Sequence, residues 1–360
     1  MKILQISNSF DLKDGGAQRL SVQFHQAYLA RGFDSHLLSL MRSSTTGLPN
    51  TYSFTSPSPY RVAIFGRLYA FLKQPQWRDL DIIHVHLFPA QAVVPLVAKL
   101  LGLKARFVTT EHNTFNRRRR LPFGKQLDRS LYRAYARIVC VSSGTKTAML
   151  EWLPELADNV VTIYNGIDLE EYRAIERHDS VGNTPIIISA GRLTEQKNYE
   201  TALNAIDRLH SHPLEYWILG QGERESALKA RVRALHLEDR VKFWGFRSDI
   251  IQALRRADIF LMMSHWEGFG LALVEAMAAG LPVVASDVPG LREVVTPESQ
   301  AGFLVEPTDA EAIAGRLRVL LDDPALRRRM GHSARLRAAD FDVGNTIAAY
   351  LELYHLVLRE

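Results

Sequence analysis

Short aliphatic and β-branched runs alternate with helical patterns along the whole chain of 360 residues. The runs expected to form strands fall into two series of six, at 3–7, 35–40, 81–86, 106–110, 137–142 and 160–164, and at 185–190, 215–219, 241–244, 258–263, 282–286 and 302–305. Helical patterns lie between them, as at 17–31, 198–210, 224–235 and 310–320. Because alternating strands and helices form parallel sheets covered on both faces, the sequence predicts an α/β fold.

A polar segment at 168–184 separates the two series, and a last amphipathic pattern at 342–359 has no strand after it. A chain of this length exceeds what one hydrophobic core usually supports. We therefore expect two doubly wound, Rossmann-like domains facing a cleft, one made of residues 1–170 plus 342–360 and the other of residues 171–341. Ligands of such sheets bind at the carboxyl ends of the strands, so chemistry is expected in the loops that follow strands.

The composition excludes several classes of protein. The single cysteine, Cys140, lies in an apolar run, so the chain has no internal disulfide and no cysteine-based metal site. The first residues become polar too soon for a signal peptide. The longest apolar stretch, at 89–103, contains Gln91, Pro95 and Lys99 and is too short to cross a bilayer. We expect a cytoplasmic protein.

The most informative loop carries two glutamates eight residues apart, Glu267 and Glu275. Glu267 follows a predicted strand, and Gly268 and Gly270 allow the backbone there to approach a ligand closely. The helix that starts at Leu271 directs its free N–H groups at the same place, and Glu275, about one turn in, could accept hydrogen bonds from a diol. The pattern predicts a socket for an anion with hydroxyl groups, such as a nucleotide sugar. An exposed turn with two unrelated glutamates is the alternative.

A second loop, after the predicted strand 185–190, places Arg192 and Lys197 around a polar turn that enters a helix. Two cations and a helix N-terminus can neutralise a diphosphate without a metal, at about 1.5–3 kcal/mol for each charge-assisted contact. A solvated charged loop is the alternative.

Three further loops carry weaker signals. Gly15 and Gly16 open a helix, which suits a backbone contact to a phosphate or a plain tight turn. Gly220 begins a Gly-Gln-Gly turn, but Glu225 stands where the dinucleotide fingerprint needs its third glycine. The turn that contains Phe246 could read the edge of a base through its backbone.

Histidines follow or lie on two neighbouring strands. His112 follows a predicted strand and could bind a substrate hydroxyl, or it could be satisfied by nearby backbone. His84 and His86 have metal-like spacing on one strand face, but no third ligand is visible nearby, so we favour a structural or cleft-lining role.

In this order and spacing, the motifs resemble the family-4-type retaining glycosyltransferases of the GT-B fold over essentially the whole chain. The motifs that carry the resemblance are Gly15-Gly16-Ala17 with Arg19, Glu111-His112-Asn113, Asn165-Gly166-Ile167-Asp168, Gly191-Arg192-Leu193 with Lys197-Asn198, Gly220 with Gly222, and Glu267 with Glu275. The set around Arg192 and Lys197 is specific in combination with the paired glutamates.

The resemblance implies a role for each motif. Arg192 and Lys197 would hold the donor diphosphate, Glu275 the ribose hydroxyls, and His112 the sugar from the other domain. Gly16 would approach the phosphate. Glu267 and the backbone of the segment Gly268, Phe269, Gly270 and Leu271 would hold the donor sugar and phosphates, and Gly220 and Phe246 complete the expected donor site. The tail helix would cross back onto the first domain.

The resemblance also implies transfer with retention of the anomeric configuration, guided by the leaving phosphate. Positive charge grows on the sugar ring and negative charge on the diphosphate, so cations at Arg192 and Lys197 act mainly in the transition state. Asp79 and Asp81 resemble a metal-binding pair, but they precede a strand. We interpret them as a strand-entry turn and predict no metal and no cofactor.

The basic character of the chain is concentrated at 104–137, where ten Lys and Arg face only Glu111 and Asp128. Lys125, Arg129, Arg133 and Arg137 recur every four residues, which predicts one basic ridge of a helix, with Leu127, Leu131, Tyr135 and Ile138 on its other face. The acceptor or membrane site is expected at Arg117, Arg118, Arg119, Arg120, Lys125 and Arg129. Either a solvated helix face or docking to an anionic membrane explains such a ridge. Nucleic acid is disfavoured because no exposed aromatics are interleaved with the charges.

Together these features predict a glycosyltransferase that moves a sugar from UDP or GDP to a glycan or lipid-linked glycan acceptor, in the cytoplasm or on the inner face of the cytoplasmic membrane. The alternatives are a soluble sugar-phosphate glycosyltransferase, a nucleotide-sugar epimerase and an inactive GT-B binding scaffold.

Overall fold

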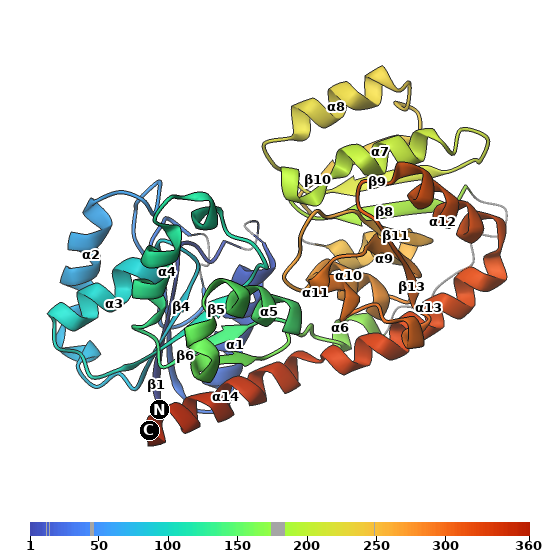
Figure 1. Cartoon of the computed structure of the whole chain (residues 1–360). Helices are drawn as coiled ribbons and strands as arrows, with labels where there is room; N and C mark the ends of the chain where they lie inside the picture. The colour runs from blue at the N-terminus through green and yellow to red at the C-terminus, as the bar shows by residue number, and fades with distance from the viewer. Residues whose placement is uncertain (12, 14, 44–46, 174–183, 248) are drawn as a thin grey trace. The chain divides into compact units, whose positions relative to one another are not determined.

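The computed structural model describes residues 1–11, 13, 15–43, 47–173, 184–247 and 249–360, and only the backbone of Arg117. Asp14, Ser248 and residues 174–183 of the expected polar segment lie outside the described residues. Contacts divide the chain into unit 1, Met1–Asn165 with Thr346–Glu360, and unit 2, Gly166–Asn345. Each unit holds one sheet with helices around it (Figure 1).

Unit 1 contains a seven-stranded parallel sheet in the order β3-β2-β1-β4-β5-β6-β7. Its strands are β1 (Lys2–Ser7), β2 (Asp34–Ser39), β3 (Thr51–Ser53), β4 (Ile82–His86), β5 (Arg106–Glu111), β6 (Arg137–Cys140) and β7 (Val160–Thr162). Its helices are α1 (Gly16–Ala30), α2 (Ala63–Leu72), α3 (Ala90–Leu100), α4 (Gly124–Tyr132), α5 (Ser143–Trp152) and most of α14 (Val343–Arg359), with short 3₁₀ turns η2 (Pro75–Trp77), η3 (Arg117–Arg120) and η4 (Pro154–Asn159). The expectation of six strands was wrong, because the three-residue edge strand β3 is too short to show a pattern.

Unit 2 contains a six-stranded parallel sheet in the order β10-β9-β8-β11-β12-β13. Its strands are β8 (Ile186–Ala190), β9 (Glu215–Leu219), β10 (Val241–Gly245), β11 (Ile259–Met262), β12 (Val283–Ser286) and β13 (Gly302–Val305). Its helices are α6 (Glu170–Arg173), α7 (Tyr199–Asp207), α8 (Glu225–Ala234), α9 (Ile250–Arg256), α10 (Leu271–Ala278), α11 (Pro289–Arg292), α12 (Ala310–Asp322) and α13 (Pro324–Ala338), with 3₁₀ turns η5 (Glu195–Lys197), η6 (Pro297–Ser299) and η7 (Ala339–Phe341).

The strand order reverses once in each sheet, between β1 and β4 in unit 1 and between β8 and β11 in unit 2. The central strands β4, β11 and β12 are buried along their whole length, as expected for strands covered on both faces. In doubly wound sheets the binding crevice lies beyond the carboxyl ends of the strands at such a reversal. The prediction of two doubly wound, Rossmann-like sheets is confirmed.

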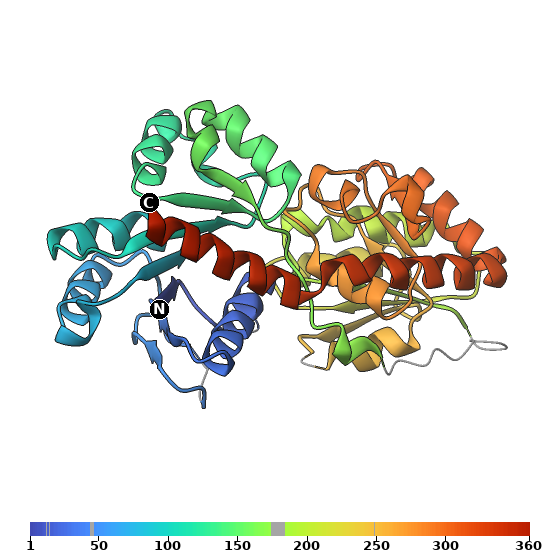
Figure 2. The same cartoon turned by 90° about the horizontal axis from the view of Figure 1, so that it is seen from below.

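Helix α14 packs on the sheet of unit 1 (Figure 2). Its buried residues recur at helical spacing, as Thr346, Ile347, Tyr350, Leu353, Tyr354 and Val357. The Tyr354 hydroxyl lies 2.6 Å from His84 Nδ1, and the Tyr350 hydroxyl lies 3.0 Å from Thr110 Oγ1. These contacts anchor the C-terminal helix to β4 and β5, in the middle of the unit 1 sheet.

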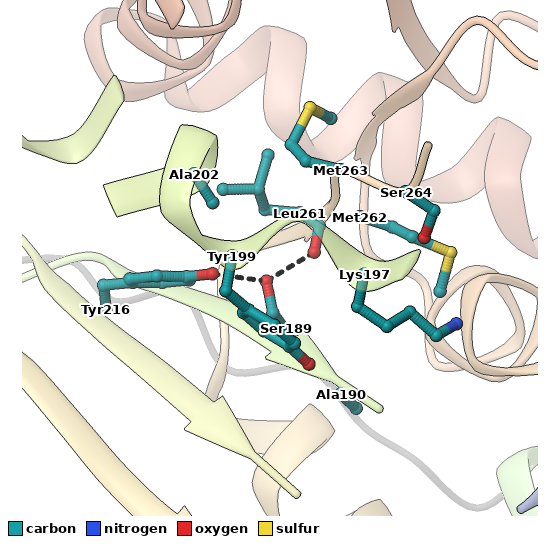
Figure 3. A pocket seen from close by; sticks show the side chains of 10 residues that line it. All are labelled: Ser189, Ala190, Lys197, Tyr199, Ala202, Tyr216, Leu261, Met262, Met263 and Ser264. Atoms are coloured by element: carbon teal, nitrogen blue, oxygen red, sulfur yellow. Dashed lines mark hydrogen bonds between the residues drawn. The ribbon is translucent and has the colours of Figure 1, made fainter. Parts of the chain in front are cut away.

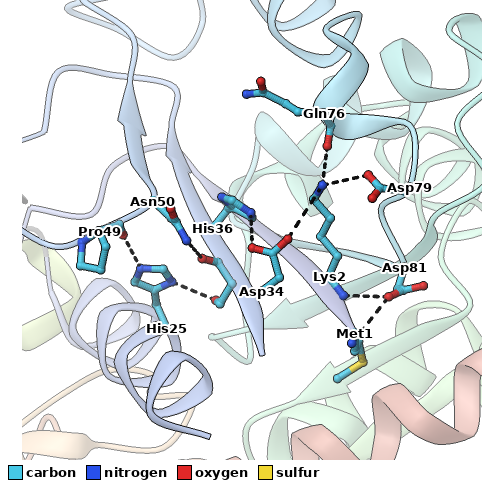
Figure 4. A network of polar contacts seen from close by, with 11 residues as sticks. Met1, Lys2, His25, Asp34, His36, Pro49, Asn50, Gln76, Asp79 and Asp81 are labelled. Carbon is cyan, nitrogen blue, oxygen red and sulfur yellow. Dashed lines mark hydrogen bonds and ion pairs between the residues drawn. The ribbon is translucent and has the colours of Figure 1, made fainter. Parts of the chain in front are cut away.

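A polar network fixes the first strand at its amino end (Figure 4). The Lys2 ammonium donates to Asp79 Oδ1 at 2.8 Å, and the Lys2 backbone N–H donates to Asp81 Oδ2 at 2.7 Å. Asp79 and Asp81 therefore lie at the entry of β4 and bind Lys2. The interpretation of this pair as a strand-entry turn is confirmed.

Candidate active site

Glu267 lies in the loop between β11 and α10, and two side chains hold its carboxylate. The Lys197 ammonium donates to Glu267 Oε1 at 2.5 Å, and the Ser264 hydroxyl donates to the same oxygen at 2.8 Å. Glu267 and Ser264 are buried, whereas Lys197 is partly exposed. The two donors share Oε1, which leaves Oε2 as the carboxylate oxygen that can accept from a ligand. The structure thus brings together two of the predicted catalytic residues, 70 positions apart.

Backbone geometry explains the glycines of this loop. Gly270 is the N-cap of α10 and has φ 90°, a conformation that favours glycine. A Cβ at Gly270 would lie 2.5 Å from Leu291 Cδ2, and a Cβ at Gly290 would lie 2.5 Å from the Glu267 carbonyl. The N-cap Gly270 has no side chain that could cap α10, and the Leu273 N–H donates to the Gly270 carbonyl at 2.9 Å. The start of α10 thus keeps the helix-terminal N–H groups of its first two residues at the carboxyl edge of the sheet. Glu275 lies on the second turn and is buried.

The predicted diphosphate loop joins β8 to α7. Asn198 ends it in the left-handed conformation, φ 47°, and donates to the Pro307 carbonyl at 2.7 Å. Arg192 is exposed, and Lys197 turns toward Glu267. The backbone and side chain of Gln196 tie this loop to the β11–α10 loop through 2.8 Å bonds with His265 and Trp266. The two loops at the strand-order reversal therefore form one connected structure.

Gly220 and Gly222 have a packing role. A Cβ at Gly220 would lie 1.9 Å from the Gly191 carbonyl oxygen, and a Cβ at Gly222 would lie 2.3 Å from the Leu193 carbonyl oxygen. The β9–α8 turn thus packs directly on the β8–α7 loop, and this close approach accounts for both glycines without a dinucleotide fingerprint. Phe246 follows β10, two strands further from the reversal, and is partly buried.

A small pocket lies beneath these loops, among side chains of β8, β9, β11 and α7 (Figure 3). The Ser189 hydroxyl lies 2.5 Å from the Leu261 carbonyl and 2.8 Å from the Tyr216 hydroxyl. Lys197 and Ser264 form part of its wall. Its volume of about 10 Å³ suits one water molecule and is too small for a sugar. The pocket is therefore a small packing space next to Lys197 and Ser264 and is not a substrate site.

In unit 1, three histidines lie in a row at the carboxyl ends of β4 and β5. The rings of His84 and His86 are 4.1 Å apart, and His86 Nδ1 lies 3.4 Å from His112 Nε2. Burial lowers the pKa of His84 to about 3 and that of His112 to about 4, and it also lowers the pKa of His86. At neutral pH the row is uncharged. His84, bound to Tyr354 and Thr110, has a structural role, whereas His112 is only partly buried.

The Gly-Gly opening lies at the reversal of the unit 1 sheet. Gly15 has φ 135° and caps α1, and Gly16 is the first residue of that helix. Among the described residues, the N-cap Gly15 makes no side-chain cap hydrogen bond to α1. Gly15 and Gly16 thus form the tight turn that was one of the two alternatives. This turn is also compatible with a phosphate contact, because it leaves N–H groups at the helix start.

Comparison with known proteins decides the family. Residues 171–337 match the glycosyl transferases group 1, and residues 14–171 match Glycosyltransferase Family 4. The chain belongs to the family-4-type glycosyltransferases of the GT-B fold.

Individual relatives match this glycosyltransferase over nearly its full length. It is 26% identical to the N-acetyl-alpha-D-glucosaminyl L-malate synthase of Bacillus anthracis, over 96% of this chain and 95% of the relative. It is 27% identical to the N-acetylgalactosamine-N,N'-diacetylbacillosaminyl-diphospho-undecaprenol 4-alpha-N-acetylgalactosaminyltransferase of Campylobacter jejuni, over 92% and 94% of the two chains. The Anabaena HepE structure with UDP and glucose has the same fold, with a TM-score of 0.84, 21% identity and coverage of 98% and 99%.

The basic segment of the glycosyltransferase differs from its prediction. Helix α4 ends at Tyr132, and Arg137 is the first residue of β6, so the ridge of four residues does not exist. Arg118 is buried, donates to Asp128 Oδ1 at 2.5 Å and lies 4.6 Å above the Phe88 ring. Arg118 therefore cannot belong to an exposed acceptor or membrane site.

The other predicted basic residues differ from one another in their contacts and in their exposure. Arg129 pairs with Glu155, Arg119 and Lys125 lie over the Trp152 ring, and Arg120 is exposed and lies over Phe115. The side chain of Arg117 lies outside the described part of the chain. Leu127, expected on the buried face of α4, is exposed. The segment is thus partly internal, and its exposed part mixes cations with apolar side chains.

The described residues contain neither a membrane-spanning helix nor a cluster of metal ligands. No helix among them is long and apolar enough to span a bilayer. No group of three or more His, Cys, Asp or Glu among them is arranged to hold a metal ion.

Three residues of the site were not predicted. Ser264 and Gln196 hold Glu267 and its loop, and Gly290 makes room for the backbone at Glu267. The sequence contained two signals for these residues. Ser264 lies three residues before Glu267, and a Pro-Gly turn follows β12. The partner of Gln196 was not visible, since it depends on the adjacency of two distant loops.

Proposed function

We propose that this glycosyltransferase transfers a sugar from a UDP- or GDP-sugar to a glycan or lipid-linked glycan, with retention of configuration and without a metal, in the assembly of cell-surface polysaccharide or glycoconjugate. The observation that carries the proposal is the Lys197–Glu267 pair at the strand-order reversal of unit 2. It places a cation and a carboxylate beside the open N-terminus of α10.

The leaving diphosphate needs compensation for its growing negative charge. Lys197 and the N–H groups at the start of α10 lie on adjoining loops, and Arg192 stands on the same loop as Lys197. Donors that are fixed before the reaction stabilise such charge at little reorganisation cost. We assign the diphosphate to these groups, with no metal in the step.

The donor sugar and ribose carry hydroxyls that need acceptors. Glu267 Oε2 is left for the sugar because Lys197 and Ser264 both bind Oε1. We assign Glu275 to the ribose and neutral His112 to a sugar hydroxyl. Because Glu267 already accepts from two donors, we assign it a holding role rather than that of a covalent nucleophile, and the acceptor attacks from the face of the leaving phosphate.

Relatives support parts of this proposal. The Anabaena structure contains UDP and glucose, and the Campylobacter jejuni relative is named for a diphospho-undecaprenol acceptor. The Bacillus anthracis relative, named for L-malate, favours a second candidate in which the acceptor is a small soluble anion.

The test is a transfer assay with UDP- and GDP-sugars, in EDTA, with undecaprenyl-diphosphate-linked and small anionic acceptors, followed by NMR of the anomeric proton. We expect nucleotide release that depends on an acceptor, and a product with the donor's anomeric configuration. An inverted product, or activity lost in EDTA and restored by a divalent cation, would contradict the proposal. Free sugar released without acceptor would indicate an epimerase, and absence of all turnover an inactive scaffold.

A further inference from the structure

His86 is the last residue of β4, and its imidazole lies between those of two other histidines. The ring of His86 is 4.1 Å from the ring of His84, and His86 Nδ1 is 3.4 Å from His112 Nε2. The two nitrogens of His84 are bonded to the Tyr354 hydroxyl at 2.6 Å and to the Thr110 hydroxyl at 2.8 Å. His86 therefore packs against a ring whose own orientation is fixed by α14 and β5.

The second ring nitrogen of His86, Nε2, is in an unusual position. It is buried and has no hydrogen-bond partner in the part of the chain that the structure describes, and His86 as a whole is only 2% exposed. Buried polar side-chain atoms usually have a hydrogen-bond partner. Among the described residues, the hydrogen bond of the His86 side chain is the one with His112 Nε2. This contact is therefore the place to look for the role of His86.

The contact between the two imidazole nitrogens requires one proton between them. Both residues are neutral at pH 7, since burial lowers the pKa of His86 and lowers the pKa of His112 to about 4. A neutral imidazole carries its proton on one nitrogen, which donates, and accepts at the other. Either His86 Nδ1–H donates to His112 Nε2, or His112 Nε2–H donates to His86 Nδ1. The tautomers of the two residues are therefore coupled.

The burial of His86 Nε2 favours one of these two arrangements. If His112 donated, the proton of His86 would lie on Nε2, as a buried N–H with no acceptor among the described residues. If His86 donates, Nε2 is instead a bare lone pair. Among buried backbone groups, an N–H without an acceptor is rarer than an acceptor with unused capacity. The geometry thus favours a proton on Nδ1 of His86 and, through the coupling, on Nδ1 of His112.

We propose that His86 is a positioning residue, which donates from Nδ1 to His112 Nε2 and so holds His112 in the tautomer that can donate a proton from Nδ1 to a ligand. The hydrogen bond of one imidazole nitrogen determines whether the other carries the proton. His112 then binds a sugar hydroxyl by donating to its oxygen, and the proton of that hydroxyl is left for a separate acceptor. The inference rests on the proposed function, which assigns His112 to a sugar hydroxyl.

The test is ¹⁵N NMR of the full-length protein labelled at its histidines, without substrate, together with steady-state kinetics. Long-range couplings from the ring C–H protons identify the nitrogen that carries the proton, and the signals of His112 are assigned by their absence in His112→Gln. His86→Phe keeps a ring and removes the donor, whereas His86→Asn keeps an N–H donor on the atom that follows Cγ. His25→Phe is the matched control, because His25 is also a buried histidine of unit 1 and its partners are Ser35 and the Pro49 carbonyl.

We expect His112 to carry its proton on Nδ1 in wild type, in His86→Asn and in His25→Phe. Free histidine prefers the Nε2–H form, so His86→Phe should shift most of the His112 population to that form. His86→Phe should also lower kcat by about tenfold, with a smaller change in the KM of the donor, because the Nδ1–H of His112 is no longer held in place. His86→Asn should restore most of kcat, and His25→Phe should change only the melting temperature.

A proton on Nε2 of His112 in wild type would overturn the inference, and so would an unchanged His112 spectrum in His86→Phe. A lower melting temperature of His86→Phe with unchanged kcat would also overturn it, since His86 would then have a structural role alone. The spectra need no substrate. The inference can therefore fail while acceptor-dependent transfer is observed, and it can hold where transfer is absent, so its failure and that of the proposed function are distinguishable.

Discussion

The two sheets share the order of their central strands, yet the carboxyl edges carry different side chains. At the reversal in unit 2, Lys197 and Glu267 are ionic partners held by Ser264 and Gln196. Beside the reversal in unit 1, three histidines lie in a row, and burial lowers the pKa of each of them. One edge therefore handles charge and the other offers neutral hydrogen-bonding groups. The same order of central strands thus supports an ion pair in unit 2 and neutral imidazoles in unit 1.

The largest expected effect comes from removing the cation in unit 2. Lys197→Ala should lower kcat by about 10²–10³-fold, because a fixed donor to the leaving group is lost. Steady-state assays would measure it. Lys229→Ala, which breaks the exposed Lys229–Glu225 pair on α8, is the control and should leave kcat unchanged. A normal kcat for Lys197→Ala would show that the Lys197 charge does not contribute to catalysis at the carboxyl edge of unit 2.

A stability effect should follow from Gly220→Ala. The added Cβ would overlap the Gly191 carbonyl oxygen, and Gly220 has φ 141°, so we expect a loss of about 1–3 kcal/mol in the unfolding free energy of unit 2. Thermal unfolding would measure it. Gly315→Ala on α12 has nothing within 4 Å and should be neutral or slightly stabilising. Equal melting temperatures for the two variants would show that the β9–α8 turn does not depend on this close contact.

Ser264→Ala tests the support of Glu267. Loss of a donor to a buried carboxylate costs about 1–3 kcal/mol, so kcat should fall by roughly tenfold or more with a smaller change in KM. Ser264→Thr should restore the rate, since it keeps the hydroxyl. Ser286→Ala, a buried serine on β12, is the control. An effect on melting temperature alone would make Ser264 structural and not a positioning residue.

The smallest effect at neutral pH concerns the histidine row, whose contribution appears only in acid. The folded-state pKa values of His84 and His112, about 3 and about 4, lie below the unfolded value near 6.5, so the unfolded chain binds more protons as the pH falls below 6.5. Unit 1 should lose about 1.4 kcal/mol per pH unit for each such histidine between pH 6.5 and its folded pKa, and nothing above pH 7. NMR titration of the ring protons would measure the pKa values. Titration of His112 near 6.5 would make the unit 1 edge cationic and would remove the contrast between the two edges.

The sequence predicted the regular parts of the molecule well. Alternating apolar runs located the strands β8 to β13 and the helix α14, since their periodicity is local. It missed β3, which is three residues long, and it extended the α4 ridge beyond Tyr132 because a spacing of four residues does not show where a helix ends.

The candidate site was predictable only in part. The loops of Lys197 and Glu267 follow strands and were found as motifs, but their contact depends on β8 lying next to β11, which no local pattern records. The burial of Asp128 depends on Arg118 and Trp152, each at a distance of 10 or more positions along the chain. Long-range partners of this kind determine which charges are internal, so the sequence alone assigned Arg118 to the surface.

The central claim is that Lys197 and Glu267 belong to a nucleoside-diphosphate site that needs no metal. Calorimetric titration of UDP, GDP and ADP into wild type and Lys197→Ala, with EDTA present, tests it most directly. We expect wild type to bind one of the three nucleotides and Lys197→Ala to bind it at least about tenfold more weakly, which would also name the base. Equal binding of that nucleotide by wild type and Lys197→Ala, or binding that appears only when a divalent cation replaces EDTA, would contradict the claim.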